Sequence, residues 1–114
     1  MKFERFEDIV GWQKAFELNQ VIYTVFKNCK DFGFKNQIQR AAVSIMNNIA
    51  EGFERKTNNE FKQFLYIAKG SCGEVRSMVY LAKSLKYLSD DNSSELLTKS
   101  TEISKILSGL IKSL

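Results

Sequence analysis

Four basic side chains recur at intervals of seven residues in the second half of the chain. We call this set the basic row: Lys62, Lys69, Arg76 and Lys83. Tyr66, Tyr80 and Tyr87 accompany the row, also at multiples of seven residues. Lys and Arg supply most of the sequence-independent affinity for nucleic acids, and tyrosines can stack on exposed bases. The pattern predicts a surface for RNA or DNA made by Lys62, Tyr66, Lys69, Arg76, Tyr80 and Lys83.

Two other interpretations of the basic row remain open. Charged side chains belong on a solvated helix face, and tyrosine hydroxyl groups also favour such edges. Alternatively, the same face packs against a neighbouring subunit, and the tyrosines then serve that interface. The chain carries a net charge of +4, and residues 57–89 alone carry +3, with five basic and two acidic side chains.

A second polar line consists of Arg40, Ser44, Asn48, Glu51 and Arg55. Its steps of four, four, three and four residues keep these side chains on one helix face. Glu74 falls on a largely apolar row, where a carboxylate needs a partner, and Arg40 or Arg55 can supply one. We therefore expect a structural polar network of Arg40, Asn48, Glu51, Arg55 and Glu74. A metal or acid–base site built on Glu51 and Glu74 is the alternative. Bundles that bind two metals typically add histidine ligands, and this chain has none.

The composition disfavours catalysis. The absence of histidine removes the commonest general base and the commonest metal ligand together. Cys29 and Cys72 lie 43 residues apart and are expected to be reduced thiols, since two thiols cannot complete a zinc site. We expect a protein that is not an enzyme and that binds neither metal nor cofactor.

The elements that must position these residues are helices. Proline is absent, and apolar side chains recur with helical spacing in four segments, at residues 8–30, 34–56, 58–88 and 91–114. Thr57 and Glu60 form a capping box before the third segment, and Gly33 suits the position after the end of the first. Short loops make sequential helices antiparallel. The sequence predicts one all-α domain over residues 1–114, an antiparallel up-down-up-down four-helix bundle.

The third predicted helix has more apolar rows than a monomer needs. Four heptad rows, beginning at Phe61, Phe64, Leu65 and Ile67, are largely apolar, whereas a bundle helix requires about three. The first predicted helix also carries two adjacent apolar seams. This extra apolar surface on the first and third helices predicts a homo-oligomer. The alternative is a monomer in which the third helix is central and its apolar rows are covered by the other helices.

Membrane insertion and export are not expected. Residues 1–8 are charged throughout and lack the apolar core of a signal peptide. The longest uncharged run, Ala41–Ala50, is far shorter than a membrane span. We expect a cytoplasmic protein.

Several motifs resemble the four-helix-bundle family of the 23S rRNA intervening sequences. The opening is similar at Phe6-Glu7-Asp8 and Trp12-Gln13-Lys14-Ala15. The centre is similar at Phe32-Gly33-Phe34, Arg40-Ala41-Ala42-Val43-Ser44-Ile45 and Asn48-Ile49-Ala50-Glu51-Gly52. The match continues from Glu60-Phe61 through Gly70-Ser71 to Glu74, so the motifs span residues 6–88.

The resemblance implies a bundle that assembles as a ring, with a pentamer the expected state. Accessory proteins of diversity-generating retroelements look similar, and these bind nucleic acid and a reverse transcriptase. The resemblance thus implies nucleic acid or an unidentified protein as partner. Gln39 stands where members often have an arginine, which weakens a transfer of nucleic-acid binding to the second helix. Met46 stands where members often have a proline that would kink the helix.

Overall fold

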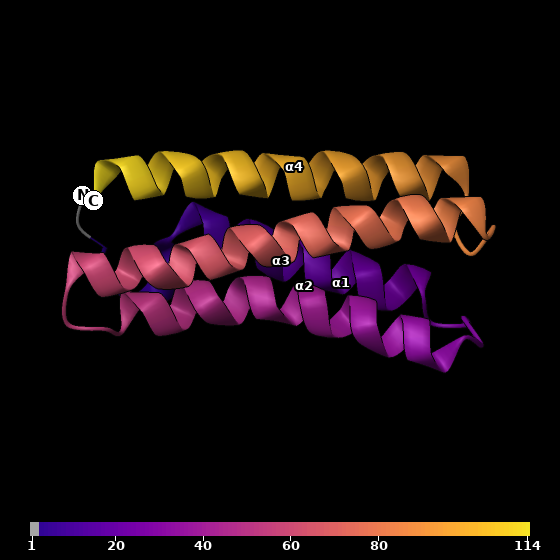
Figure 1. The fold of residues 1–114 in the computed structure, drawn as a ribbon, viewed down its shortest axis with the longest axis horizontal. Helices are drawn as coiled ribbons and strands as arrows, with labels where there is room; N and C mark the ends of the chain where they lie inside the picture. The colour runs from indigo at the N-terminus through magenta and orange to yellow at the C-terminus, as the bar shows by residue number, and fades with distance from the viewer. Residues whose placement is uncertain (1–2) are drawn as a thin grey trace.

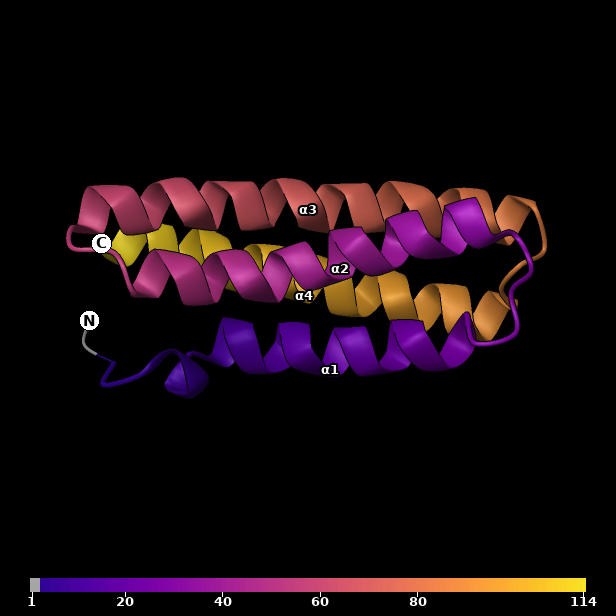
Figure 2. The ribbon, with the colours of Figure 1, turned by 90° about the horizontal axis from the view of Figure 1, so that it is seen from below.

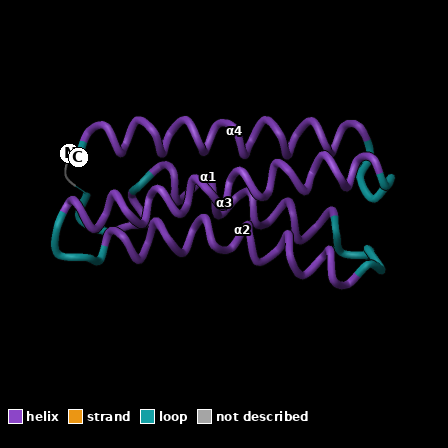
Figure 3. The backbone as a smooth tube through the Cα atoms, viewed as in Figure 1, coloured by secondary structure: helices purple, strands orange, loops and turns teal. Residues whose placement is uncertain are grey.

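Four α-helices make up most of the protein. The computed structural model describes residues 3–114; Met1 and Lys2, which begin the charged N-terminal segment, lie outside the described residues. A short 3-10 helix, η1 (Phe6–Asp8), precedes α1 (Val10–Val25) and α2 (Phe32–Phe53). The second half contains α3 (Asn58–Ser84) and α4 (Asp90–Ser113). Figure 3 shows only helices and connecting loops over the described residues.

The helices form an elongated antiparallel bundle that measures 43 × 21 × 19 Å (Figure 1). Each helix contacts two neighbours, so that α1 contacts α2 and α4, and α3 contacts the same two helices. The view in Figure 2 places α1 and α3 at opposite edges of the bundle. The predicted all-α up-down-up-down fold is confirmed.

The core is built from the helical rows that face the bundle axis. On α3, the rows of Phe61 and Leu65 are buried along their whole length. These rows contain Phe61, Leu65, Ala68, Cys72, Val75, Val79 and Ala82. Ile38, Ile45 and Ile49 of α2 are fully buried opposite them. Burying one such aliphatic side chain stabilises the fold by about 1.5–3 kcal/mol.

Side-chain caps fix the beginnings of three helices. The Thr57 hydroxyl accepts a hydrogen bond from the Glu60 backbone N–H at 3.1 Å, which confirms Thr57 as the N-cap of α3. The Glu60 carboxylate accepts instead from the Thr57 hydroxyl at 3.4 Å and from Arg55 Nε at 3.1 Å, so the predicted capping box is confirmed only in part. Asp31 Oδ1 accepts from the Phe34 backbone N–H at 3.1 Å, and Ser89 caps α4 in the same way. These bonds satisfy amide groups that have no partner inside their helices.

Several predicted helix ends are wrong. The first helix ends at Val25 rather than at residue 30, and the second ends at Phe53 rather than at residue 56. Two further differences have identifiable reasons. Gly33 does not end the first helix but lies inside α2, because Asp31 caps α2 and starts it at Phe32. The third helix stops at Ser84 rather than at residue 88. Lys86 adopts φ of 63°, and the Tyr87 N–H bonds to the carbonyl oxygen five residues earlier at 2.8 Å. This left-handed C-terminal turn usually contains glycine, so the sequence gives no signal for it.

Candidate nucleic-acid interface

The basic row lies along the edge of α3 and not at the centre of its outer face. Lys62, Lys69 and Arg76 are half-buried, and Lys83 is exposed. The Lys69 ammonium reaches across to α4, which places the edge on the α4 side. The row therefore borders the junction between α3 and α4.

Lys69 is held by hydroxyl groups of α4. Its Nζ donates to Ser104 Oγ at 3.0 Å and to Ser108 Oγ at 2.7 Å, with a longer contact of 3.4 Å to the Ser104 carbonyl oxygen. An ammonium has three donors, so these contacts use all of them. Lys69 thus keeps its charge at the surface while its direct hydrogen bonds go to its own chain.

Within residues 3–114, no carboxylate forms an ion pair with the basic row. The ion pairs described within 4.0 Å are Arg5–Asp8, Lys14–Glu102 and Arg55–Glu60, and all of them involve other cations. The Lys69 partners are neutral hydroxyl and carbonyl groups. The four charges of the row therefore add along one edge of the bundle, as binding to a phosphate chain requires.

The centre of the outer face of α3 is partly apolar. Tyr66 and Tyr80 are 57% and 59% exposed, as predicted for bases to stack on, but Ile67 and Leu81 are also 52% and 51% exposed. The row that contains Ile67, Glu74 and Leu81 faces solvent, because α3 contacts only α2 and α4 among the major helices. Leu88 continues this row beyond the end of α3, and it is buried.

Tyr87 has a different environment from Tyr66 and Tyr80. It is half-buried, and its hydroxyl group donates to Asp31 Oδ2 at 2.7 Å. Its ring meets the Phe34 ring edge to face at 5.4 Å between centroids. The hydrogen bond from Tyr87, with a second from the Phe34 amide, lowers the pKa of Asp31, and the same bond raises the pKa of Tyr87. Tyr87 joins the α3–α4 turn to the start of α2.

The predicted pairing of Glu74 with an arginine of α2 is wrong. Glu74 is exposed, and its carboxylate accepts a hydrogen bond from Gln37 Nε2 at 3.0 Å. Arg55 pairs instead with Glu60, at 3.1 Å between Nε and Oε2, and lies over the Phe64 ring. The error arises because the row of Glu74 faces outward, where a carboxylate needs no buried partner.

Short polar side chains link α2 and α3 in place of that network. Asn48 Nδ2 donates to the Ser44 carbonyl oxygen and hydroxyl group at 2.8 and 2.9 Å. The Ser71 hydroxyl group donates to Ser44 Oγ at 2.9 Å. The sequence placed Ser71 on an apolar row but did not indicate this partner. Arg40 and Glu51 have no ionic partner among the described residues.

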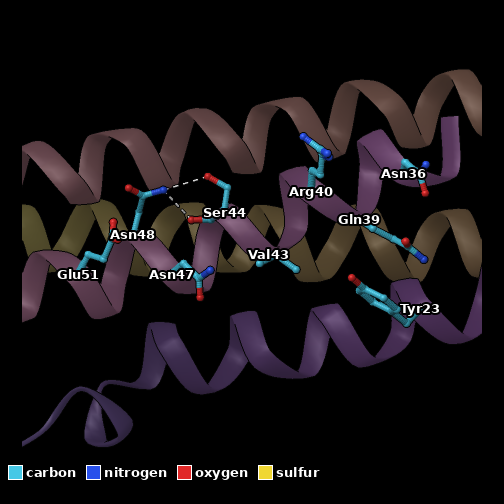
Figure 4. Close-up of a pocket in the computed structure, with 9 residues that line it drawn as sticks. All are labelled: Tyr23, Asn36, Gln39, Arg40, Val43, Ser44, Asn47, Asn48 and Glu51. Carbon is cyan, nitrogen blue, oxygen red and sulfur yellow. Dashed lines mark hydrogen bonds between the residues drawn. The ribbon is translucent and has the colours of Figure 1, made fainter. Parts of the chain in front are cut away.

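A shallow polar groove of about 690 Å³ follows the outer face of α2 (Figure 4). Its lining comprises Tyr23, Asn36, Gln39, Arg40, Val43, Ser44, Asn47, Asn48 and Glu51. The structure thus brings Arg40, Asn48 and Glu51 of the predicted network to one surface, without direct bonds among them. Tyr23 of α1 and the additional amide side chains were missed, because residues of two helices form the groove.

The two cysteines lie in different environments. Burial raises the pKa of the Cys72 thiol to about 12, so this thiol stays protonated and inert. Cys29 is half-buried, with its sulfur 3.9 Å from the Asp31 carbonyl oxygen. Along residues 3–114, none of the helices combines the length and apolar character needed to cross a bilayer.

An antiparallel four-helix bundle is the class of protein that the fold defines. The family model described as 23S rRNA-intervening sequence protein matches residues 7–109. The chain therefore belongs to the 23S rRNA-intervening sequence protein family, as the sequence motifs implied.

A solved structure supports the same assignment. A protein with unknown function from the S23 ribosomal protein family of Bacteroides thetaiotaomicron VPI-5482 superimposes with a TM-score of 0.84 at 27% sequence identity. The alignment covers 90% of this chain and 98% of that chain. No match is found among the curated proteins.

Proposed function

We propose that this protein is a non-enzymatic, homo-oligomeric bundle that binds RNA or DNA with little sequence preference. The basic row carries the proposal, because its four charges lie along one helix edge without a carboxylate partner among the described residues. Tyr66 and Tyr80 lie on the same helix with more than half of their surface exposed. Each tyrosine can stack on an unpaired base regardless of its identity.

The four residues of the basic row do not all act in the same way in this proposal. Lys62, Arg76 and Lys83 contact phosphate oxygens directly, whereas Lys69 contributes its charge from its position against α4. Nothing in the row reads base edges, which explains the expected lack of sequence preference. In an oligomer, each copy repeats the row, so weak contacts to one long strand reinforce each other.

A homo-oligomer forms part of the proposal, and the family resemblance favours a pentameric ring. Exposed large apolar side chains on both α1 and α3 support association of several copies. Light scattering at micromolar concentration tests this part. A mass that is a multiple of 13.1 kDa is expected, and a monomer overturns it.

Fluorescence anisotropy with a labelled single-stranded oligonucleotide tests nucleic-acid binding. The parent is compared with a basic-row variant that carries Lys62→Gln, Lys69→Gln, Arg76→Gln and Lys83→Gln. The matched control removes four exposed charges elsewhere, through Lys27→Gln, Lys30→Gln, Lys56→Gln and Lys105→Gln. We expect the control to retain more affinity than the basic-row variant, at unchanged oligomeric state. Equal affinity of the two variants contradicts the role of the row.

A protein-interaction scaffold without nucleic-acid binding is the second candidate. The exposed Ile67 and Leu81 favour it, since aliphatic side chains at the centre of an outer face suit a protein partner better than a phosphate chain. An oligomer that fails to bind any oligonucleotide at low salt supports this candidate over the first.

A further inference from the structure

Two glycines on α3 have no explanation within a single copy. Gly70 and Gly73 lie in the interior of a 27-residue helix, where glycine is less favourable than alanine. A Cβ atom at either position would meet no atom within 4 Å, and neither residue has a positive φ. Gly52 of α2 differs, because a Cβ there would lie 2.6 Å from Phe64 Cβ. The fold of the protomer thus requires Gly52 but not Gly70, Gly73 or the equally exposed Gly109 of α4. Gly70 and Gly73 differ from Gly109 because exposed large apolar side chains flank them on α3.

The two glycines lie between bulky exposed side chains. Tyr66 and Ile67 precede them and Tyr80 and Leu81 follow them, so that the two pairs are fourteen residues apart, about 21 Å along the helix axis. We call this surface the α3 notch; its residues are Tyr66, Ile67, Gly70, Gly73, Tyr80 and Leu81. A packed helix is about 10–12 Å across with its side chains, so the spacing accommodates one crossing helix.

A second exposed apolar surface lies on α1, the helix at the opposite edge of the bundle (Figure 2). Phe16 and Tyr23 are 43% and 47% exposed and are seven residues apart, which places them on one face of the helix. The Phe16 ring stacks on Trp12, with 5.4 Å between centroids, and this contact restricts its motion. We call Phe16 and Tyr23 the α1 ridge.

We propose that the α3 notch of one copy binds the α1 ridge of a second copy. This inference rests on the oligomer in the proposed function and names the surfaces that form it. In this assembly Tyr66 and Tyr80 pack against the neighbouring copy and do not stack on bases, so nucleic-acid binding depends on the charges of the basic row. An aromatic ring of the ridge fills the space over Gly70 and Gly73, where the absence of side chains lets the two helices approach closely. The close contact gives Gly70 and Gly73 a packing role that a single copy does not provide.

The available surface is large enough for a specific contact. Tyr66, Ile67, Tyr80, Leu81 and Leu85 each expose about half of their surface. A tyrosine buries roughly 150–250 Å² when covered completely, and an aliphatic side chain buries less. With about half of each side chain exposed, these five together provide a few hundred Å². With the neighbouring backbone and polar side chains, this approaches the roughly 800 Å² per partner of a standard interface.

Charge complementarity supports a second copy as the occupant. Glu74 follows Gly73 directly, is exposed, and has no cationic partner within the described chain. Arg40 lines the same groove as Tyr23 of the ridge and also lacks an ionic partner there. Contact between copies brings this cation and this carboxylate to one interface. The two surfaces differ, so the association is head-to-tail, and it continues until a ring closes.

Two variants, each defective in one surface, test the proposal. Gly73→Arg blocks the notch, and a Phe16→Ser/Tyr23→Ser double variant removes the ridge. Both are measured alone and as an equimolar mixture by light scattering, with circular dichroism to verify the helical fold. Gly109→Arg is the matched control, because Gly109 of α4 is also exposed, with no atom within 4 Å of an added Cβ.

We expect each defective variant to be a 13.1 kDa monomer, and their mixture to form a 1:1 dimer through the one intact pair of surfaces. Gly109→Arg is expected to keep the mass of the parent. A monomeric parent overturns the proposal, and so does a Gly73→Arg variant that assembles like the parent. A mixture that remains monomeric overturns the head-to-tail arrangement.

A milder substitution covers the case in which Gly73→Arg does not fold. The Gly70→Ala/Gly73→Ala double variant adds helix propensity but places two methyl groups in the notch. We expect association to weaken about tenfold or more, the fold-change that corresponds to the strain of added methyl groups in a close-packed contact. Gly109→Ala leaves association unchanged. Unweakened association of the double variant overturns the proposal.

The same variants separate this inference from the nucleic-acid function. All of them retain the basic row, so monomeric variants still bind an oligonucleotide through single rows if the proposed function is right. If the parent is an oligomer that does not bind the oligonucleotide, nucleic-acid binding is overturned. If the mixed variants then form the expected dimer, the contact between notch and ridge is supported independently.

Discussion

Gly52 lies where the C-terminal end of α2 packs directly against the first turns of α3, and Gly52→Ala tests this contact. A Cβ atom there would lie 2.6 Å from Phe64 Cβ and 2.9 Å from Phe61 Cδ1. Real Cβ atoms do not approach other carbons this closely. Phe64 Cβ is attached directly to its own backbone, so no side-chain rotation relieves the contact and the two helices must separate.

The expected size of the effect follows from two opposing contributions. Inserting a methyl group into a close-packed contact costs about 1–3 kcal/mol, and the rigid contact with Phe64 Cβ favours the upper part of this range. Alanine offsets up to about 1 kcal/mol through its higher helix propensity. We expect Gly52→Ala to lower the free energy of unfolding by about 1–2 kcal/mol, and Tm by about 4–8 °C.

Thermal denaturation followed by circular dichroism, at one fixed protein concentration, measures this loss. Gly109→Ala is the control, because the same substitution at an exposed position of α4 meets no atom within 4 Å. We expect this control to be as stable as the parent or more so. A Gly52→Ala variant at least as stable as the parent would refute the close approach of α2 and α3 at this position.

Three further outcomes follow from individual side chains. Glu74→Ala should change the free energy of unfolding by no more than about 0.5 kcal/mol in urea, because Glu74 is exposed; a loss above about 3 kcal/mol would indicate a buried ion pair. A thiol reagent at neutral pH should modify Cys29 first and Cys72 only after unfolding, since burial raises the pKa of Cys72 to about 12; equal rates would contradict this burial. The lowered pKa of Asp31 stabilises the fold above the ordinary carboxyl pKa, and this contribution disappears as pH falls through the lowered value. Tyr87→Phe should therefore weaken the dependence of Tm on acidic pH, and an unchanged dependence would exclude the Tyr87–Asp31 bond as its cause.

The helical architecture was predictable because the capping residues and the spacing of apolar side chains indicate the same helices. Thr57 predicted the start of the third helix, and the rows of Phe61 and Leu65 predicted its buried face; the N-cap and both buried rows are confirmed. The end of α3 was not predictable, since Lys86 occupies a left-handed position without being glycine or asparagine. There, packing of Tyr87 against α2 outweighs the local backbone preference.

The arrangement of the surface was harder to predict. Heptad spacing shows which residues share a helix face, but it does not show whether that face points to the core, to a neighbouring helix or to solvent. The rows of Lys69 and Glu74 were each assigned a direction from residue type alone. The contacts of α3 with α2 and α4 turn the basic row toward α4 and leave the row of Glu74 exposed. The sequence therefore did not predict the hydrogen bonds from Lys69 to Ser104 and Ser108, or the hydrogen bond between Ser44 and Ser71. Whether these surfaces bind nucleic acid stays a prediction.

The salt dependence of oligonucleotide binding tests the proposed function most directly. Each phosphate neutralised on a single strand contributes about −0.7 to the slope of log K against log salt, so the three direct contacts of Lys62, Arg76 and Lys83 predict a slope of about −2. The charge of Lys69, which lies in the same row, brings the expected slope towards about −3. Engagement of several rows in an oligomer makes the slope steeper. We expect the basic-row variant to lose most of this slope while keeping the oligomeric state of the parent. A parent slope near zero, or equal slopes for parent and variant, would contradict phosphate binding by the basic row.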